Sequence, residues 1–176
     1  MLVTTDQAPI LEDWLNGRQR AGLDRYDYWD LGVYVVVTGP SPEHNMVASD
    51  IQDALKPAAK AQGLVYAPQI NIGIDKQDCR VPDAAVFDRD TPRTSAAFLA
   101  TALLVVEVLS PDETPQAKLD FYARWHVAEY LEADPAAKTV RLWRRDGEPS
   151  ERWVETQRSG VLDLDVDAIR ATIIWP

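Results

Sequence analysis

Two acidic residues interrupt segments of the chain that are otherwise apolar. Asp83 lies within residues 81–87 and Glu107 within residues 103–109, and both segments are predicted strands. Burying a carboxylate costs several kcal/mol unless it is paired or binds a metal ion. Two such acids in neighbouring strands therefore favour a shared divalent cation. The alternative, which spacing alone leaves open, is that each acid caps a loop or pairs with an arginine such as Arg80.

Lys118 and Tyr122 follow these acids on a predicted helix. Lys118 comes eleven residues after Glu107, so a strand, turn and helix of this length would bring its ammonium back beside that carboxylate. In a metal-dependent hydrolase it would orient the attacking water or stabilise charge on the scissile phosphate. Tyr122 shares its helix face and could donate to a substrate phosphate or to a carboxylate. The alternatives are a solvated lysine and a tyrosine that only packs the helix onto the sheet.

His44 is a second candidate for substrate binding, because it falls in the first turn of a predicted helix. A helix N-terminus suits an anion such as phosphate. With two histidines and one cysteine in the chain, a zinc site of the usual His/Cys kind is not expected. The chain has neither a glycine-rich phosphate loop nor a Gly-x-Ser-x-Gly elbow. Kinases, dinucleotide enzymes and ordinary serine hydrolases are therefore not favoured.

Length and charge limit the remaining possibilities. The 176 residues suit a single domain, and a net charge of −10 argues against a broad basic face for nucleic acid. The longest apolar run, residues 96–109, is too short to span a membrane and contains Glu107. Residues 1–6 carry no signal-peptide pattern, and Cys79 alone cannot form an intrachain disulfide. We therefore expect a cytoplasmic protein without a membrane segment.

The pattern of apolar residues predicts alternating strands and helices. Helices are expected at residues 11–15, 42–62 and 112–125. Strands are expected at residues 26–38 (one or two, turned at Gly32), 64–74, 80–87, 103–109, 127–132, 139–144 and 153–157. The most apolar strand, 103–109, should be central, whereas residues 163–176 fit either a short helix or a strand. The strand–helix–strand crossover indicates an α/β or α+β fold with a mixed sheet.

Individual residues are expected to set the helix boundaries. Gly17 should end the first helix, and Ser41 should cap the second, with a proline at the first position. Pro57 should kink or interrupt this second helix, and Gly63 should end it. Ser110 is the expected cap of the third helix.

These candidate residues also form a recognisable order. Val81-Pro82-Asp83 is followed by Val-Glu-Val-Leu-Ser-Pro at residues 106–111, and then by Lys118 and Tyr122. This order resembles the Uma-two-type family of putative restriction endonucleases, in the PD-(D/E)XK nuclease superfamily. The likeness covers residues 26–144. Two flanking segments also resemble the family: residues 32–44 and 127–135.

The resemblance implies a fold, an activity and roles for three residues. It implies one PD-(D/E)XK nuclease-like domain over residues 1–176, with a restriction-endonuclease-like mixed sheet flanked by helices. Asp83 and Glu107 would hold one or two Mg²⁺ or Mn²⁺ ions. Lys118 would activate or position water, since Leu109 stands where the superfamily's usual lysine would be. The implied reaction is hydrolysis of DNA phosphodiester bonds by an endonuclease, and a homodimer is the implied assembly.

A second function belongs to another class. The chain could be a catalytically inactive nuclease-fold module for binding or regulation. The net charge of −10 favours this alternative and implies weak or target-restricted DNA binding. The presence of Asp83, Glu107 and Lys118 opposes it. Whether Asp27 or another acid completes a metal site is left open.

Overall fold

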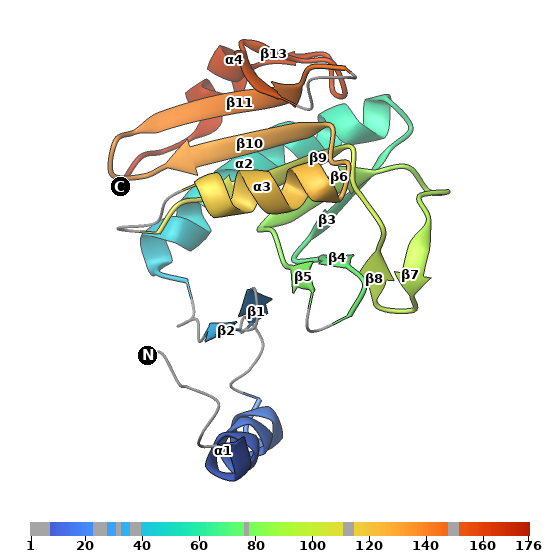
Figure 1. Ribbon diagram of the computed structural model, residues 1–176. Helices are drawn as coiled ribbons and strands as arrows, with labels where there is room; N and C mark the ends of the chain where they lie inside the picture. The colour runs from blue at the N-terminus through green and yellow to red at the C-terminus, as the bar shows by residue number, and fades with distance from the viewer. Residues whose placement is uncertain are drawn as a thin grey trace.

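A six-stranded mixed β-sheet forms the centre of the computed structural model (Figure 1). The structure describes residues 8–22, 28–30, 33–35, 40–75, 78–110, 115–147 and 152–176. In spatial order, the strands of the sheet are β12 (Trp153–Thr156), β11 (Thr139–Arg145), β10 (Glu129–Asp134), β9 (Leu104–Val108), β6 (Ala84–Phe87) and β3 (Val65–Pro68). The expected mixed sheet flanked by helices is confirmed.

Helices cover both faces of this sheet (Figure 1). One face packs against α2 (Pro42–Ala61) and α4 (Val166–Thr172), and the other packs against α3 (Gln116–Arg124). Strand residues alternate between the faces, as pleated strands require. The face of α2 and α4 takes Leu104, Val106, Val108, Leu131 and Ala133. Val105 and Tyr130 belong to the face of α3, so the same alternation aims Glu107 and Glu132 toward α3.

The chain passes from β9 through α3 to β10, and the two strands pair in parallel. All five residues of β9 are buried, and the strand lies between β10 and β6. The prediction that residues 103–109 form a central strand is therefore confirmed, as is the strand–helix–strand crossover. This crossover lays α3 directly over the residues that β9 and β10 direct to its side.

The two long strands predicted at residues 64–74 and 80–87 are wrong as continuous elements. Each is broken in two, so β4 (Asn71–Gly73) and β5 (Cys79–Arg80) leave the main sheet. They join β8 (Phe98–Leu99) and β7 (Arg93–Ser95) in a second sheet. Gln69 makes the first break with a left-handed φ of 49°, which ordinary strand backbone excludes. At the second break, Pro82 has no N–H for a ladder bond.

Gly73 at the end of β4 approaches the backbone of the neighbouring strand closely. Gly73 adopts φ +140°, and a Cβ there would lie 2.1 Å from the carbonyl oxygen of Asp78. Only glycine fits such a backbone conformation at such a close approach. Steric contact therefore requires glycine at position 73.

Three expectations about the helices are corrected. α1 (Ala8–Arg20) continues through Gly17, because one helical glycine costs only about 1 kcal/mol relative to alanine. α2 runs through Pro57, so the predicted interruption is wrong, while the predicted kink stays a prediction. The buried stripe of α2, formed by Val47, Ile51, Leu55 and Ala59, packs on the sheet. Ser110 does not cap α3, which begins after Pro115 without a side-chain cap. Ser41 does cap α2, with its Oγ accepting from the His44 N–H at 3.2 Å.

The N-terminal strands and the C-terminal tail settle the remaining alternatives. β1 (Tyr28–Asp30) and β2 (Val33–Val35) pair antiparallel, so residues 26–38 hold two strands, and Gly32 lies outside the described residues. The tail forms both kinds of element, β14 (Leu164–Asp165) and then α4.

Within the described ranges, no helix combines the length and apolarity needed to cross a membrane.

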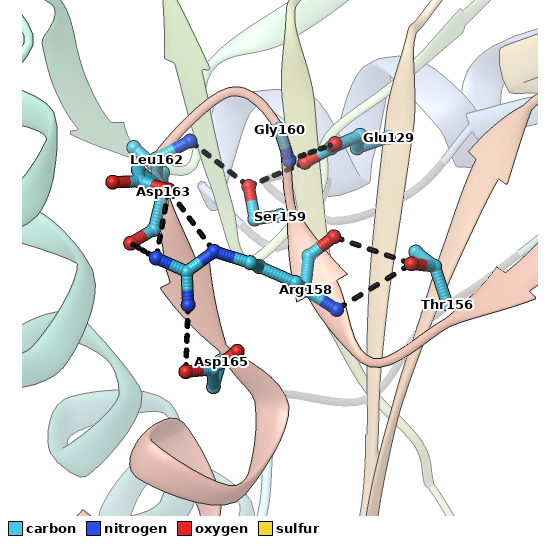
Figure 2. A network of polar contacts seen from close by, with 8 residues as sticks. All are labelled: Glu129, Thr156, Arg158, Ser159, Gly160, Leu162, Asp163 and Asp165. Carbon is cyan, nitrogen blue, oxygen red and sulfur yellow. Dashed lines mark hydrogen bonds and ion pairs between the residues drawn. The ribbon is translucent and has the colours of Figure 1, made fainter.

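A buried carboxylate ties the C-terminal region to the main sheet (Figure 2). Glu129 of β10 is 1% exposed and accepts from Ser159 Oγ at 2.5 Å and from the Gly160 N–H at 2.7 Å. Ser159 belongs to β13 (Arg158–Ser159), which pairs with β14. Nearby, the exposed Arg158 forms ion pairs of 2.7 Å with both Asp163 and Asp165. The buried bonds, rather than these exposed pairs, hold the tail in place, since exposed pairs contribute little.

Candidate functional site

Glu107 lies at the centre of the candidate site, with its side chain toward α3. The residue is 5% exposed, and both of its carboxylate oxygens are occupied. Lys118 Nζ donates to Oε2 at 2.8 Å, and Tyr122 OH donates to Oε1 at 2.5 Å. Lys118 and Tyr122 stand four residues apart on α3, so one helix face supplies both donors. The structure thus brings these three sequence-predicted residues together.

Burial dominates the electrostatics of this trio. It raises the pKa of the Glu107 carboxyl, which Lys118 lowers in part and the nearby Asp83 raises further. Burial also raises the pKa of the Tyr122 hydroxyl, and the charge of Glu107 adds to this effect. Tyr122 therefore keeps its proton and acts as a hydrogen-bond donor. Its ring packs against Tyr130 with centroids 5.9 Å apart, which fixes the hydroxyl in position.

Asp83 lies one residue before β6 and next to β9, the strand that pairs with β6. The antiparallel register pairs Ala84 with Val106, and one further step places Asp83 opposite Glu107. Asp83 Oδ2 accepts from the Val108 N–H at 2.7 Å, a bond that holds its carboxylate against β9.

His44 reaches the same carboxylate from the first turn of α2. Its Nε2 lies 2.9 Å from Asp83 Oδ1, with the imidazole as donor because an ionised carboxylate only accepts. The side chains of His44 and Asp83 are 12% and 20% exposed, so this end of the site is the more accessible to solvent. That His44 and Tyr122 contact a substrate stays a prediction, since each bonds to a carboxylate of the site.

The alternative in which Arg80 pairs with one of the acids does not hold. Among the described residues, the partners of Asp83 are His44 and Val108, and those of Glu107 are on α3. Arg80 instead places its guanidinium over the ring of Phe121, 5.6 Å from the centroid. Asp27, considered above as a further acid, lies outside the described residues.

The donor set of the site suits a hard divalent cation. Mg²⁺ and Mn²⁺ prefer carboxylate oxygens, and Asp83 and Glu107 present four of them from adjacent strands. In the described part of the chain, no three His, Cys, Asp or Glu residues are clustered as metal ligands. All four carboxylate oxygens already accept hydrogen bonds. A cation at Glu107 would therefore lie beside a donor from α3 and would share or displace it.

The sequence reasoning missed one residue beside the site, Glu132. It lies in β10 in direct register with Glu107 and is 4% exposed. The signal was present, because Glu132 is also an acid within an apolar predicted strand. The same pattern, an acid within an apolar segment, also indicates Glu129, which accepts hydrogen bonds from Ser159 and Gly160.

Comparisons with known proteins bear on the family and the fold of this chain. Residues 11–169 match the family model described as "Uma2: Putative restriction endonuclease". The fold is similar to the crystal structure of "a putative nuclease belonging to DUF820" from Anabaena variabilis ATCC 29413. That likeness has a TM-score of 0.60 and 16% sequence identity, and covers 83% of this chain and 90% of that one. A search of the curated proteins found no match.

Proposed function

This chain belongs to the Uma2 family, and we propose that it is a metal-dependent endonuclease that hydrolyses phosphodiester bonds of DNA. The observation that carries the proposal is the contact between Lys118 and the buried Glu107, beside Asp83 on the adjacent strand. Two neighbouring acids can hold a divalent cation for phosphodiester hydrolysis, and a lysine can stabilise charge on the phosphate. The proximity of these side chains, where β6 begins beside β9, supports the proposal.

Asp83 and Glu107 would hold Mg²⁺ or Mn²⁺ through their oxygens. A bound divalent cation supplies an acidic water and neutralises charge on the phosphate. The chain's own residues would do the rest. Tyr122 fixes the orientation of Glu107, His44 fixes that of Asp83, and Lys118 keeps a compact positive charge beside the reacting phosphate. The more exposed end of the site, at His44 and Asp83, would admit the substrate.

The acidic charge of the chain limits what DNA it can bind. With a net charge of −10, long-range repulsion acts against any duplex, so contacts must be local or supported by the cation. We therefore propose weak or target-restricted DNA binding. A homodimer, which the family resemblance suggested, stays part of this proposal, and light scattering of the purified protein would test it.

A catalytically inactive binding or regulatory module is the second candidate function. It is favoured by the fact that every oxygen of Asp83 and Glu107 already accepts a hydrogen bond. In such a module the five side chains of the site, on His44, Asp83, Glu107, Lys118 and Tyr122, would only stabilise the fold. The two functions differ in whether the site takes up a cation.

Isothermal calorimetry with Mn²⁺ separates these functions. An endonuclease should bind Mn²⁺, and Asp83→Ala should abolish the binding. Asp88→Asn is the matched control, because Asp88 is an exposed acid at the other end of β6. If the wild-type chain takes up no Mn²⁺, the metal-dependent proposal is wrong and the inactive module is favoured.

A further inference from the structure

Glu132 of β10 is a buried acid, and the proposed reaction assigns no role to it. Parallel pairing of β9 and β10 sets it beside Glu107 on the face of α3, and neighbouring strands are about 4.8 Å apart. Its Oε2 is buried and has no hydrogen-bond partner among the residues that the structure describes. A buried carboxylate oxygen without a donor is costly, so this oxygen is available to a new donor.

Two positively charged side chains, of Arg141 and Lys118, lie near Glu132, and they differ in their exposure to solvent. Burial raises the pKa of its carboxyl, while Arg141 and Lys118 lower it. Arg141, directly opposite on β11, is exposed, and no ion pair within the described ranges joins it to Glu132. Lys118 is largely buried, with its side chain 15% exposed and its ammonium on Glu107. In this drier setting the attraction between Lys118 and Glu132 is less screened.

A cation bound to Glu107 would affect the position of the Lys118 ammonium. Lys118 Nζ lies 2.8 Å from Glu107 Oε2, so a divalent cation on Glu107 would lie close to the ammonium and repel it. A buried acceptor that lies beside Glu107 but away from the cation would stabilise an ammonium moved by this repulsion. A lysine has three donors on a flexible stem and can turn to a neighbouring acceptor.

We infer that Glu132 is a positioning residue that receives the Lys118 ammonium when Glu107 coordinates a divalent cation. The inference rests on the proposed function. Lys118 is thereby kept in the site after it leaves Glu107, with its charge beside the bound phosphate. Glu132 thus acts through Lys118 and does not itself bind the cation.

A double-mutant cycle on Mn²⁺ affinity tests this role without any measurement of activity. The four proteins are the wild type, Glu132→Gln, Lys118→Met and the double variant, each titrated with Mn²⁺ by calorimetry. With Lys118 present, Glu132→Gln should weaken Mn²⁺ binding by about tenfold, the lower end for a hydrogen bond to a charged group. With Lys118→Met, the same change should alter the affinity by less than about twofold.

The other outcomes are distinct. An equal loss of affinity in both backgrounds would make Glu132 a direct metal ligand, and no loss in either would leave it a structural acid; both overturn the inference. No Mn²⁺ binding by the wild type would overturn the proposed function and, with it, the inference. Circular dichroism checks that each variant folds. If Glu132→Gln does not fold, Glu132→Asp, which withdraws the carboxylate by one methylene, should show the same dependence on Lys118.

Discussion

Replacement of Lys118 by alanine should destabilise the metal-free protein. The Lys118–Glu107 pair is 2.8 Å long, and the two side chains are only 15% and 7% exposed. Loss of one partner leaves the other charge buried, which costs about 3–5 kcal/mol for a fully buried pair. Tyr122 continues to donate to Glu107, so we expect the lower end of this range, about 3 kcal/mol.

Urea unfolding followed by circular dichroism measures this loss directly. Lys60→Ala is the control, since Lys60 is exposed near the end of α2 and should change the free energy of unfolding by no more than about 0.5 kcal/mol. The double variant Lys118→Ala/Glu107→Gln should recover most of the loss, because it removes the unpaired charge. A loss below about 1 kcal/mol in Lys118→Ala would show that Lys118 is a solvated helix lysine, and the reasoning would fail.

The same variant makes a separate prediction for the reaction. Lys118→Ala should still bind Mn²⁺, because the ammonium repels a cation at Glu107 rather than binding it. Cleavage should fall by about 10²–10³-fold, the usual cost of losing a donor to developing charge. A cleavage rate within a few-fold of wild type would remove Lys118 from the mechanism.

Three further predictions concern the site and the fold. Ser159→Ala should lower the free energy of unfolding by about 2–3 kcal/mol, since it removes a donor from the buried carboxylate of Glu129 (Figure 2). The control Ser95→Ala, on the surface, should have little effect, and urea unfolding measures both variants. Gly73→Ala should cost about 2 kcal/mol or more and lower Tm, while Gly147→Ala, with open space around it, should not. Glu107→Gln should retain the fold by circular dichroism and lose Mn²⁺ binding by calorimetry; unfolding instead would make Glu107 a structural partner.

The local part of this site could be predicted from the sequence. An acid within an apolar segment indicated Glu107 and Asp83, because burial of a charge needs a compensating partner wherever it occurs. The spacing from Glu107 to Lys118 fits a strand followed by a returning helix, and the four-residue step to Tyr122 fits one helix face. These are short-range rules, and they located α3 over β9.

The partners that come from distant parts of the chain could not be predicted. His44 bonds to Asp83 across 39 residues, a contact that depends on where α2 begins relative to the sheet. The position of Glu132 beside Glu107 depends on the register of β9 and β10, which no local pattern specifies. The broken strands likewise depend on the left-handed backbone of Gln69, a conformation that glutamine seldom adopts. The uninterrupted α2 shows packing prevailing over the local preference of Pro57.

The proposed reaction is hydrolysis of DNA at this site with the help of a divalent cation. Supercoiled plasmid and single-stranded DNA, incubated with the protein and Mn²⁺ and then separated on a gel, test it most directly. The wild type and the surface control Asp88→Asn should convert substrate to nicked, linear or shortened products. Glu107→Gln, and the wild type with a chelator, should not. Cleavage that persists in Glu107→Gln at the wild-type rate, or that is absent from the wild type with both substrates, would contradict the account.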